Sequence, residues 1–250
     1  MSKKSRKSRH VRSVRDDNIV RHHFEERQNW HPLDEQIDNN RDQRYLKKIK
    51  PRSDGQADLM KAIGEYSLTL AIGPAGTGKT YIAISQAVEA LEAGKIERII
   101  LSRPAMEAGE SLGYLPGDMH EKMAPYLRPL YDALGDRLGG KKVRQYIEDG
   151  TIEIAPVGFM RGRTLNNSFV VIDEAQNCTY AQLKMILSRL GWHSTMVVTG
   201  DPDQSDLLDG ISGLSDIARR LETVPNIAVI RLNQKDIVRH PLVAEMLDVL

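Results

Sequence analysis

The stretch that decides the fold is SLTLAIGPAGTGKTYIAISQAVEALEAG, residues 67–94. It opens with an apolar run at 67–72, which is typical of a buried strand. It ends with a segment whose apolar residues recur at helical spacing, and Gly94 is a suitable helix stop. The string between them, GPAGTGKT (73–80), fits the pattern G-x-x-x-x-G-K-[ST]. Because a strand before and a helix after are the context that this pattern requires, we predict a phosphate-binding loop here.

Each part of this loop has an expected role. Glycines allow backbone N–H groups to converge on phosphate oxygens, and a helix N-terminus adds a favourable dipole. Lys79 is expected to pair with the β- and γ-phosphates, and Thr80 to place its hydroxyl on Mg²⁺. The expected nucleotide contacts are Gly73, Pro74, Ala75, Gly76, Thr77, Gly78, Lys79 and Thr80.

A second apolar run is followed at once by two carboxylates, in VVIDEAQN (170–177). Adjacent like charges at the end of a buried strand are unfavourable unless something cationic or reactive is held there. We predict that Asp173 holds Mg²⁺ through water and that Glu174 is the base that activates water. A guanine-reading N-K-x-D string would indicate GTP, but the nearest string, NQKD (233–236), has its lysine one place late. ATP is therefore the expected nucleotide.

Strand-like and helix-like segments alternate through the rest of the chain. The expected strands are 67–72, 98–102, 151–155, 169–172, 195–199 and 227–232, and further amphipathic helices are expected at 180–191 and 241–250. This alternation predicts an α/β fold with a parallel sheet covered on both faces. Residues 103–150 are too long for a simple crossover, so we favour a functional lid or binding surface over a helical layer that only packs on the sheet.

Charge is distributed unevenly along the 250 residues. Residues 1–50 carry 14 Lys/Arg and 8 Asp/Glu, and the first 15 residues contain seven basic residues and no acidic one. We predict a basic N-terminal extension over residues 1–45, either contacting nucleic acid or keeping the protein soluble. The single cysteine, Cys178, and the lack of a long apolar run predict a cytoplasmic protein with no membrane segment.

Several strings together resemble known families. GPAGTGKT, VVIDEAQN and TGDPDQ (199–204) are similar to motifs I, II and III of superfamily 1 helicases. The strings at 103–134, MRGRTLNN (160–167) and DIVRHPLV (236–243) resemble the PhoH-like ATPases more narrowly. The resemblance covers roughly residues 50–250, so we expect one domain over 46–250. It implies a RecA-like core, ATP hydrolysis with Mg²⁺, and a link to RNA, with single-stranded RNA as the expected partner.

The resemblance also suggests roles for two glutamines. Gln56 would read the adenine edge, although Ser53-x-x-Gln56 is also a capping-box pattern in which Gln56 simply caps a helix. Gln204 would sense the γ-phosphate, although GDPDQ could be only a strand-to-helix turn.

A superfamily 1 helicase encloses ATP between two lobes, whereas this sequence carries one. We therefore expect a neighbouring copy to supply an arginine, in a homo-oligomeric ring whose expected number of subunits is six. Arg239 is the first candidate, and Arg161 and Arg163 are its rivals. Two alternatives stay open: a nucleotide-dependent nucleic-acid-binding or stress protein that unwinds nothing, and a P-loop kinase of a small molecule.

Overall fold

The computed structural model describes residues 48–104, 119–208 and 211–238. The expected basic extension, part of the 103–150 segment, Arg239 and the expected helix at 241–250 lie outside these ranges.

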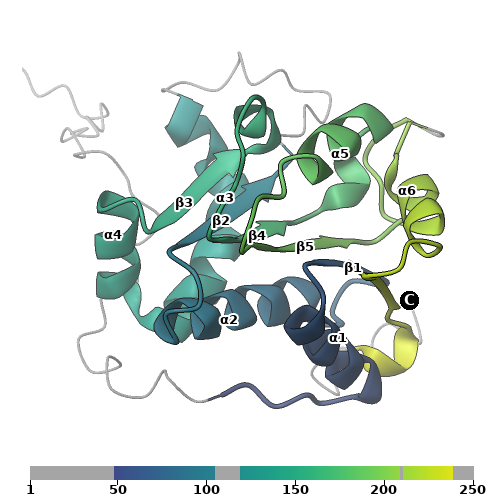
Figure 1. Ribbon diagram of the computed structural model, residues 1–250, viewed down its shortest axis with the longest axis horizontal. Helices are drawn as coiled ribbons and strands as arrows, with labels where there is room; N and C mark the ends of the chain where they lie inside the picture. Colours follow the sequence, from purple (N-terminus) through teal and green to yellow (C-terminus); the bar gives the residue numbers. More distant parts are fainter. Residues whose placement is uncertain (1–47, 105–118, 209–210, 239–250) are drawn as a thin grey trace, which may run out of the picture. The chain divides into compact units, whose positions relative to one another are not determined.

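A six-stranded sheet forms the centre of the described chain (Figure 1). Its strand order is β3-β2-β4-β5-β1-β6, and every neighbouring pair is parallel. Strands β1 and β4 are buried along their whole length, which explains why they read as continuous apolar runs. The strands are β1 (Leu68–Ile72), β2 (Arg98–Arg103), β3 (Ile152–Pro156), β4 (Ser168–Ile172), β5 (Thr195–Gly200) and β6 (Ile227–Arg231).

Helices cover both faces of this sheet. One core contains side chains from α1 (Asp54–Glu65), α2 (Lys79–Glu92), α3 (Met119–Leu138) and α4 (Gly140–Glu148). The other contains side chains from α5 (Tyr180–Leu187) and α6 (Leu214–Leu221). Alternate strand residues enter opposite cores: Val171 faces the first and Val170 the second. The predicted α/β fold with a doubly covered parallel sheet is therefore confirmed.

The strand order places the functional strings together. Strand β5 lies between β1, which leads into the phosphate-binding loop, and β4, which ends at the acidic pair. An inserted strand between these two is the RecA-like arrangement. Because parallel strands share one carboxyl edge, the residues that follow β1, β4 and β5 meet at that edge.

Two expected helices end as follows. Helix α2 stops at Glu92, and Gly94 has φ +65°, as expected for a glycine that terminates a helix. Helix α5 ends at Leu187, whereas the helix was expected to run to 191, and the next two residues form a turn.

The segment at 103–150 supplies two helices to the described fold. Side chains of α3, including Leu127, Leu130 and Leu134, are almost fully buried in the first core. This described part therefore packs as a helical layer, while residues 105–118, where a lid or binding surface was expected, lie outside the described chain. In the described ranges, every helix is too short or too polar to cross a membrane.

Candidate nucleotide-binding site

The loop after β1 has a backbone that only glycine adopts easily. Gly73, Gly76 and Gly78 have φ values of +146°, +83° and +80°. A Cβ on Gly73 would lie 2.3 Å from the backbone oxygen of Leu232, so a side chain there would clash with the chain that follows β6. Gly78 is the N-cap of α2 and offers no capping side chain. This loop can therefore turn its N–H groups and the start of α2 toward an anion.

Lys79, in the first turn of α2, is bent back onto this loop. Its Nζ donates to the backbone oxygens of Gly73 at 2.6 Å and Pro74 at 2.8 Å. Burial lowers the pKa of Lys79 from its ordinary value, although the carboxylates of Asp201, Glu174 and Asp173 oppose this shift. A desolvated ammonium group beside glycine N–H groups is suited to phosphate.

Asp173 and Thr80 meet across the cleft. The Thr80 hydroxyl donates to Asp173 Oδ1 at 2.6 Å, and the hydroxyl of Thr199, in β5, donates to the same oxygen at 2.7 Å. Asp173 is only 3% exposed. Mg²⁺ in nucleotide sites uses one or two such hard oxygen ligands together with substrate phosphates, so these residues fit the ion. No cluster of three or more His, Cys, Asp or Glu side chains that could hold a metal occurs in the described chain.

Glu174 lies directly after Asp173 in a left-handed backbone conformation, with φ 53° and ψ 41°. Its Oε2 accepts a hydrogen bond from the amide of Gln176, and its Oε1 pairs with Arg103 Nη2 at 3.2 Å. Gln176 is itself fixed, because its Oε1 accepts from the backbone N–H of Asp201 at 3.0 Å. The carboxylate is thus placed by residues from the ends of β2, β4 and β5.

Gln204 lies at the same cleft, four residues after the end of β5. Together with Lys79, Asp173 and Glu174 it lines a hollow of about 310 Å³, which runs along the phosphate-binding loop. Its backbone N–H donates to Asp201 O at 3.1 Å, so it also belongs to a turn, as the simpler interpretation held. The structure brings Gln204 to the cleft without testing a sensor role.

Gln56 supports the loop from behind. It is 5% exposed, its Nε2 donates to Thr77 O at 3.0 Å, and its Oε1 accepts from the Arg52 N–H at 2.9 Å. The Ser53 side chain caps α1 by accepting from the Gln56 N–H, but the reciprocal capping-box bond to Ser53 is replaced by the bond to Arg52. The adenine contact stays a prediction.

The chain after β6 also supports the loop. The Val238 N–H donates to Gly76 O at 3.0 Å, and Asp236 accepts from the Gly55 N–H at 3.2 Å at the start of α1. Hydrogen bonds from the Asn233 backbone, Ser53 and the Gly55 backbone hold the pKa of the Asp236 carboxyl below its usual range.

The expected trans-acting arginines differ in their surroundings. Arg163 makes a two-pronged pair with Glu153, at 2.5 and 2.6 Å, whereas Arg161 is exposed. Arg239 lies outside the described residues. Cys178 is fully buried, and burial raises the pKa of its thiol to about 12, which agrees with an inert small residue.

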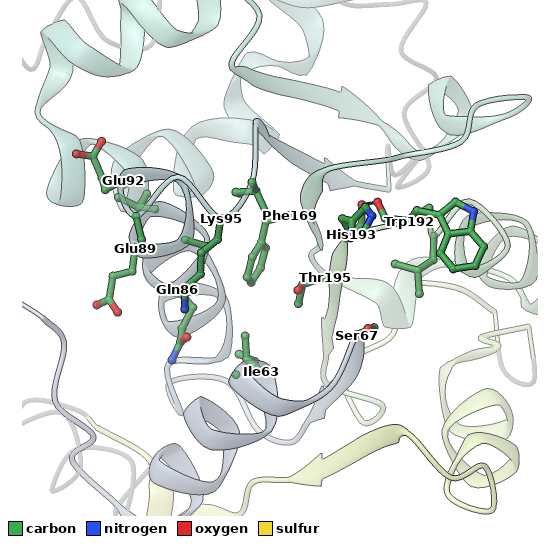
Figure 2. A pocket seen from close by; sticks show the side chains of 18 of the residues that line it. Ile63, Ser67, Gln86, Glu89, Glu92, Lys95, Phe169, Trp192, His193 and Thr195 are labelled. Carbon is green, nitrogen blue, oxygen red and sulfur yellow. Dashed lines mark hydrogen bonds between the residues drawn. The ribbon is translucent and has the colours of Figure 1, made fainter.

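A larger hollow, of about 1180 Å³, lies at the opposite edge of the sheet (Figure 2). Its lining includes Ser67 and Thr195, at the amino ends of β1 and β5, and Phe169 near the start of β4. Its cationic and anionic side chains are mixed, because Lys95, Glu89 and Glu92 all belong to the lining. It has no glycine-rich loop facing a buried carboxylate, so size alone does not make it the nucleotide site.

Comparisons with known proteins agree with the motifs. Residues 48–250 match the family model described as PhoH-like protein. This chain belongs to the PhoH-like family. Its relatives include the PhoH-like proteins of Bacillus subtilis, 53% identical over 203 residues, and of Synechocystis sp., 50% identical over 201 residues. Protein PhoH of Escherichia coli K12 is 46% identical over 205 residues.

These matches cover about four fifths of this chain but not all of its relatives. They include 81% of this chain and 64% of the Bacillus protein, 80% and 61% for the Synechocystis protein, and 81% and 58% for Escherichia coli PhoH. The chain therefore spans about 60% of the length of the curated relatives that it matches. Membership of the PhoH-like family confirms the resemblance that the sequence strings indicated.

Sequence reasoning missed three residues of this site. Thr199 and Gln176 stand inside the quoted strings TGDPDQ and VVIDEAQN, but nothing in the strings shows that they contact Asp173 and Glu174. Arg103 is the first residue of the string at 103–134, which carries the resemblance but does not show that this side chain contacts Glu174. A signal was nevertheless available, because Arg103 follows a strand and parallel strands share their carboxyl edge.

Proposed function

We propose that this PhoH-like chain binds ATP with Mg²⁺ and hydrolyses the γ-phosphate. The observation that carries the proposal is the contact between Thr80 and Asp173 at 2.6 Å, beside the desolvated ammonium group of Lys79. These groups come from α2 and from the end of β4, and they line one cleft along the glycine-rich loop. Lys79 and the loop N–H groups would neutralise a phosphate chain, and the carboxylate of Asp173 would neutralise a divalent cation.

Each residue then has one task. The loop N–H groups and Lys79 bind the phosphates, while Thr80 and Asp173 would hold Mg²⁺ directly or through water. When bound, the ion neutralises charge that develops on the phosphate oxygens. Glu174 accepts a proton from the attacking water, whose oxygen forms the new bond to the γ-phosphorus as the bond to ADP breaks. Gln204 lies where it could respond to the γ-phosphate.

The carboxylate next to Asp173 favours hydrolysis over the kinase alternative. A kinase of a small molecule excludes water and transfers phosphate to a bound acceptor, so it has less use for a water-activating base at this point. In this chain Glu174 lines the nucleotide cleft, and its side chain is 36% exposed.

We propose further that the ATPase acts on or with single-stranded RNA as a ring of identical subunits, with six as the expected number. The basic residues at 1–15 support an RNA contact through phosphate charges. The ring hypothesis is supported by the need for an arginine at the transition state, with Arg239 as first candidate and a neighbouring copy as its source. A nucleotide-dependent RNA-binding protein that unwinds nothing remains the alternative.

Phosphate release from Mg·ATP, with and without single-stranded RNA and alongside a solution mass, tests these proposals together. We expect basal release that RNA stimulates, and a mass corresponding to several subunits. Mixing Arg239→Ala with Glu174→Gln tests the trans arginine, because a mixed ring can place an intact Arg239 beside an intact Glu174. If the two inactive variants stay inactive after verified subunit exchange, Arg239 does not act on the ATP of a neighbouring subunit.

A further inference from the structure

Arg103 is the last residue of β2 and makes two contacts that join separate parts of the fold. Its Nη2 pairs with Glu174 Oε1 at 3.2 Å, and its Nη1 donates to the backbone oxygen of Tyr126, in α3, at 3.0 Å. The Arg103 side chain is 21% exposed, and its contact with Glu174 is partly buried, whereas its contact with Tyr126 is exposed. One guanidinium group therefore ties the expected water-activating carboxylate to a helix that belongs to the 103–150 segment.

Glu174 is held from two sides by this contact and by the amide of Gln176. Each carboxylate oxygen already accepts a hydrogen bond, Oε1 from Arg103 and Oε2 from Gln176. Gln176 is 2% exposed and bonded to the N–H of Asp201, so it is a fixed partner. Arg103 is the less buried of the two partners, and it is the one attached to a separate helix. Moving Glu174 toward a bound phosphate requires Arg103 to follow or to let go.

Arg103 reaches Glu174 from outside the nucleotide cleft. Glu174 lines both the cleft along the phosphate-binding loop and a neighbouring hollow of about 450 Å³. Arg103 lines the neighbouring hollow together with Gln176 and Gln204, and it is absent from the described residues that line the cleft. In this arrangement Arg103 contacts Glu174 and does not lie among the phosphate-binding groups.

We propose that Arg103 is a positioning residue that restrains Glu174 in a resting orientation, and that turnover requires this ion pair to open. The proposal rests on the proposed hydrolysis, in which Glu174 accepts the proton from water. The Tyr126 carbonyl gives the restraint its anchor. A displacement of α3 relative to β4 would change the hold on Glu174 without touching the phosphate-binding loop.

The test compares steady-state kinetics of Mg·ATP hydrolysis for the parent and for Arg103→Ala. Removing the restraint should raise kcat by about threefold or more while KM stays within about twofold, because the phosphate contacts are untouched. Arg103→Lys keeps a cation beside Glu174, so its kcat should return toward the parent value. If Arg103 had a purely structural role, both variants would have a lower melting temperature, kcat would not rise in Arg103→Ala, and Arg103→Lys would not return it toward the parent value.

Arg231→Ala is the matched control. Arg231 is also the last residue of a strand, and it also pairs with a glutamate, Glu222, at 2.6 Å. That pair is exposed on both sides, so its loss should leave kcat within about twofold of the parent. If Arg103→Ala does not fold, Arg103→Gln replaces it, since glutamine can donate a hydrogen bond but carries no charge.

The outcomes separate this inference from the proposed function. The double variant Arg103→Ala with Glu174→Gln must be inactive if the gain passes through Glu174. The proposed restraint is wrong if the parent hydrolyses ATP and the kcat of Arg103→Ala is unchanged or lower. If the parent and Arg103→Ala both bind Mg·ATP and neither releases phosphate, the proposed hydrolysis fails. An inactive parent with an active Arg103→Ala would support both proposals.

Discussion

The two edges of the sheet carry hollows of opposite character. At the carboxyl edge, a cleft of about 310 Å³ is lined by a cation, three carboxylates and a glycine-rich backbone. At the amino edge, a hollow of about 1180 Å³ mixes apolar walls with scattered charges (Figure 2). The smaller cleft gathers the candidate functional side chains because three strand ends converge on it. At the other edge, the described lining of the larger hollow has no glycine-rich loop beside a buried carboxylate.

Lys79→Ala should give the largest contrast between the two edges. Mg·ATP at about 100 times its dissociation constant should stabilise the parent by about 2.7 kcal/mol, and Lys79→Ala should lose this gain at the same concentration. Thermal unfolding with and without nucleotide measures the difference. Lys142→Ala, which removes an exposed lysine paired with Glu92, should keep the full gain. An undiminished gain in Lys79→Ala would refute binding at the loop.

Gln56→Ala sharpens the comparison of the two edges, because it distinguishes a contact with the adenine base from support of the phosphate-binding loop. We expect the ATP affinity to fall by roughly tenfold, as for loss of a buried hydrogen-bonding group, and the GTP affinity to fall less. Titration of both nucleotides provides the measurement. If the ATP and GTP affinities fall equally, Gln56 does not contact the adenine base and only supports the loop through Thr77. Gln86→Ala is the control from the opposite edge, where the amide donates to Met60 O at 3.3 Å and lines the larger hollow.

Trp192→Ala should have the smallest effect. This side chain is 81% exposed and stands at the mouth of the larger hollow. Its removal should change the free energy of unfolding by no more than about 0.5 kcal/mol and leave ATP affinity unchanged. Chemical denaturation and nucleotide titration check both numbers. A clear loss of ATP affinity would mean that the larger hollow contributes to the nucleotide site.

Local patterns were enough to predict the frame of this molecule. All six strands were expected within two residues of their observed ends. The central strands β1 and β4 read as continuous apolar runs because they are buried on both faces. Lys79, Thr80, Asp173 and Glu174 line one cleft, since each stands next to a strand or helix end that the pattern reveals, while their roles stay predictions. The family strings added the expectation that Gln204 joins them.

The contacts that fix these groups could not be predicted in the same way. Arg103 and Glu174 are 71 residues apart, and only the strand order β2-β4 brings their ends together. Thr199 reaches Asp173 because β5 is inserted beside β4, which no local string reveals. For Gln56 the local pattern was only half right. Ser53 caps α1 by accepting from the Gln56 N–H, but the Gln56 side chain bonds to the backbone of Arg52 and Thr77 instead of to Ser53.

The central claim, that Glu174 activates water in the carboxyl-edge cleft, is tested most directly by single-turnover phosphate release from Mg·ATP. Glu174→Gln should slow release by about 10²–10⁴-fold while binding ATP nearly as tightly as the parent, because the amide keeps the shape but cannot take the proton. Glu222→Gln, an exposed glutamate paired with Arg231, should release phosphate at the parent rate. A Glu174→Gln protein that binds ATP and releases phosphate as fast as the parent would contradict the account.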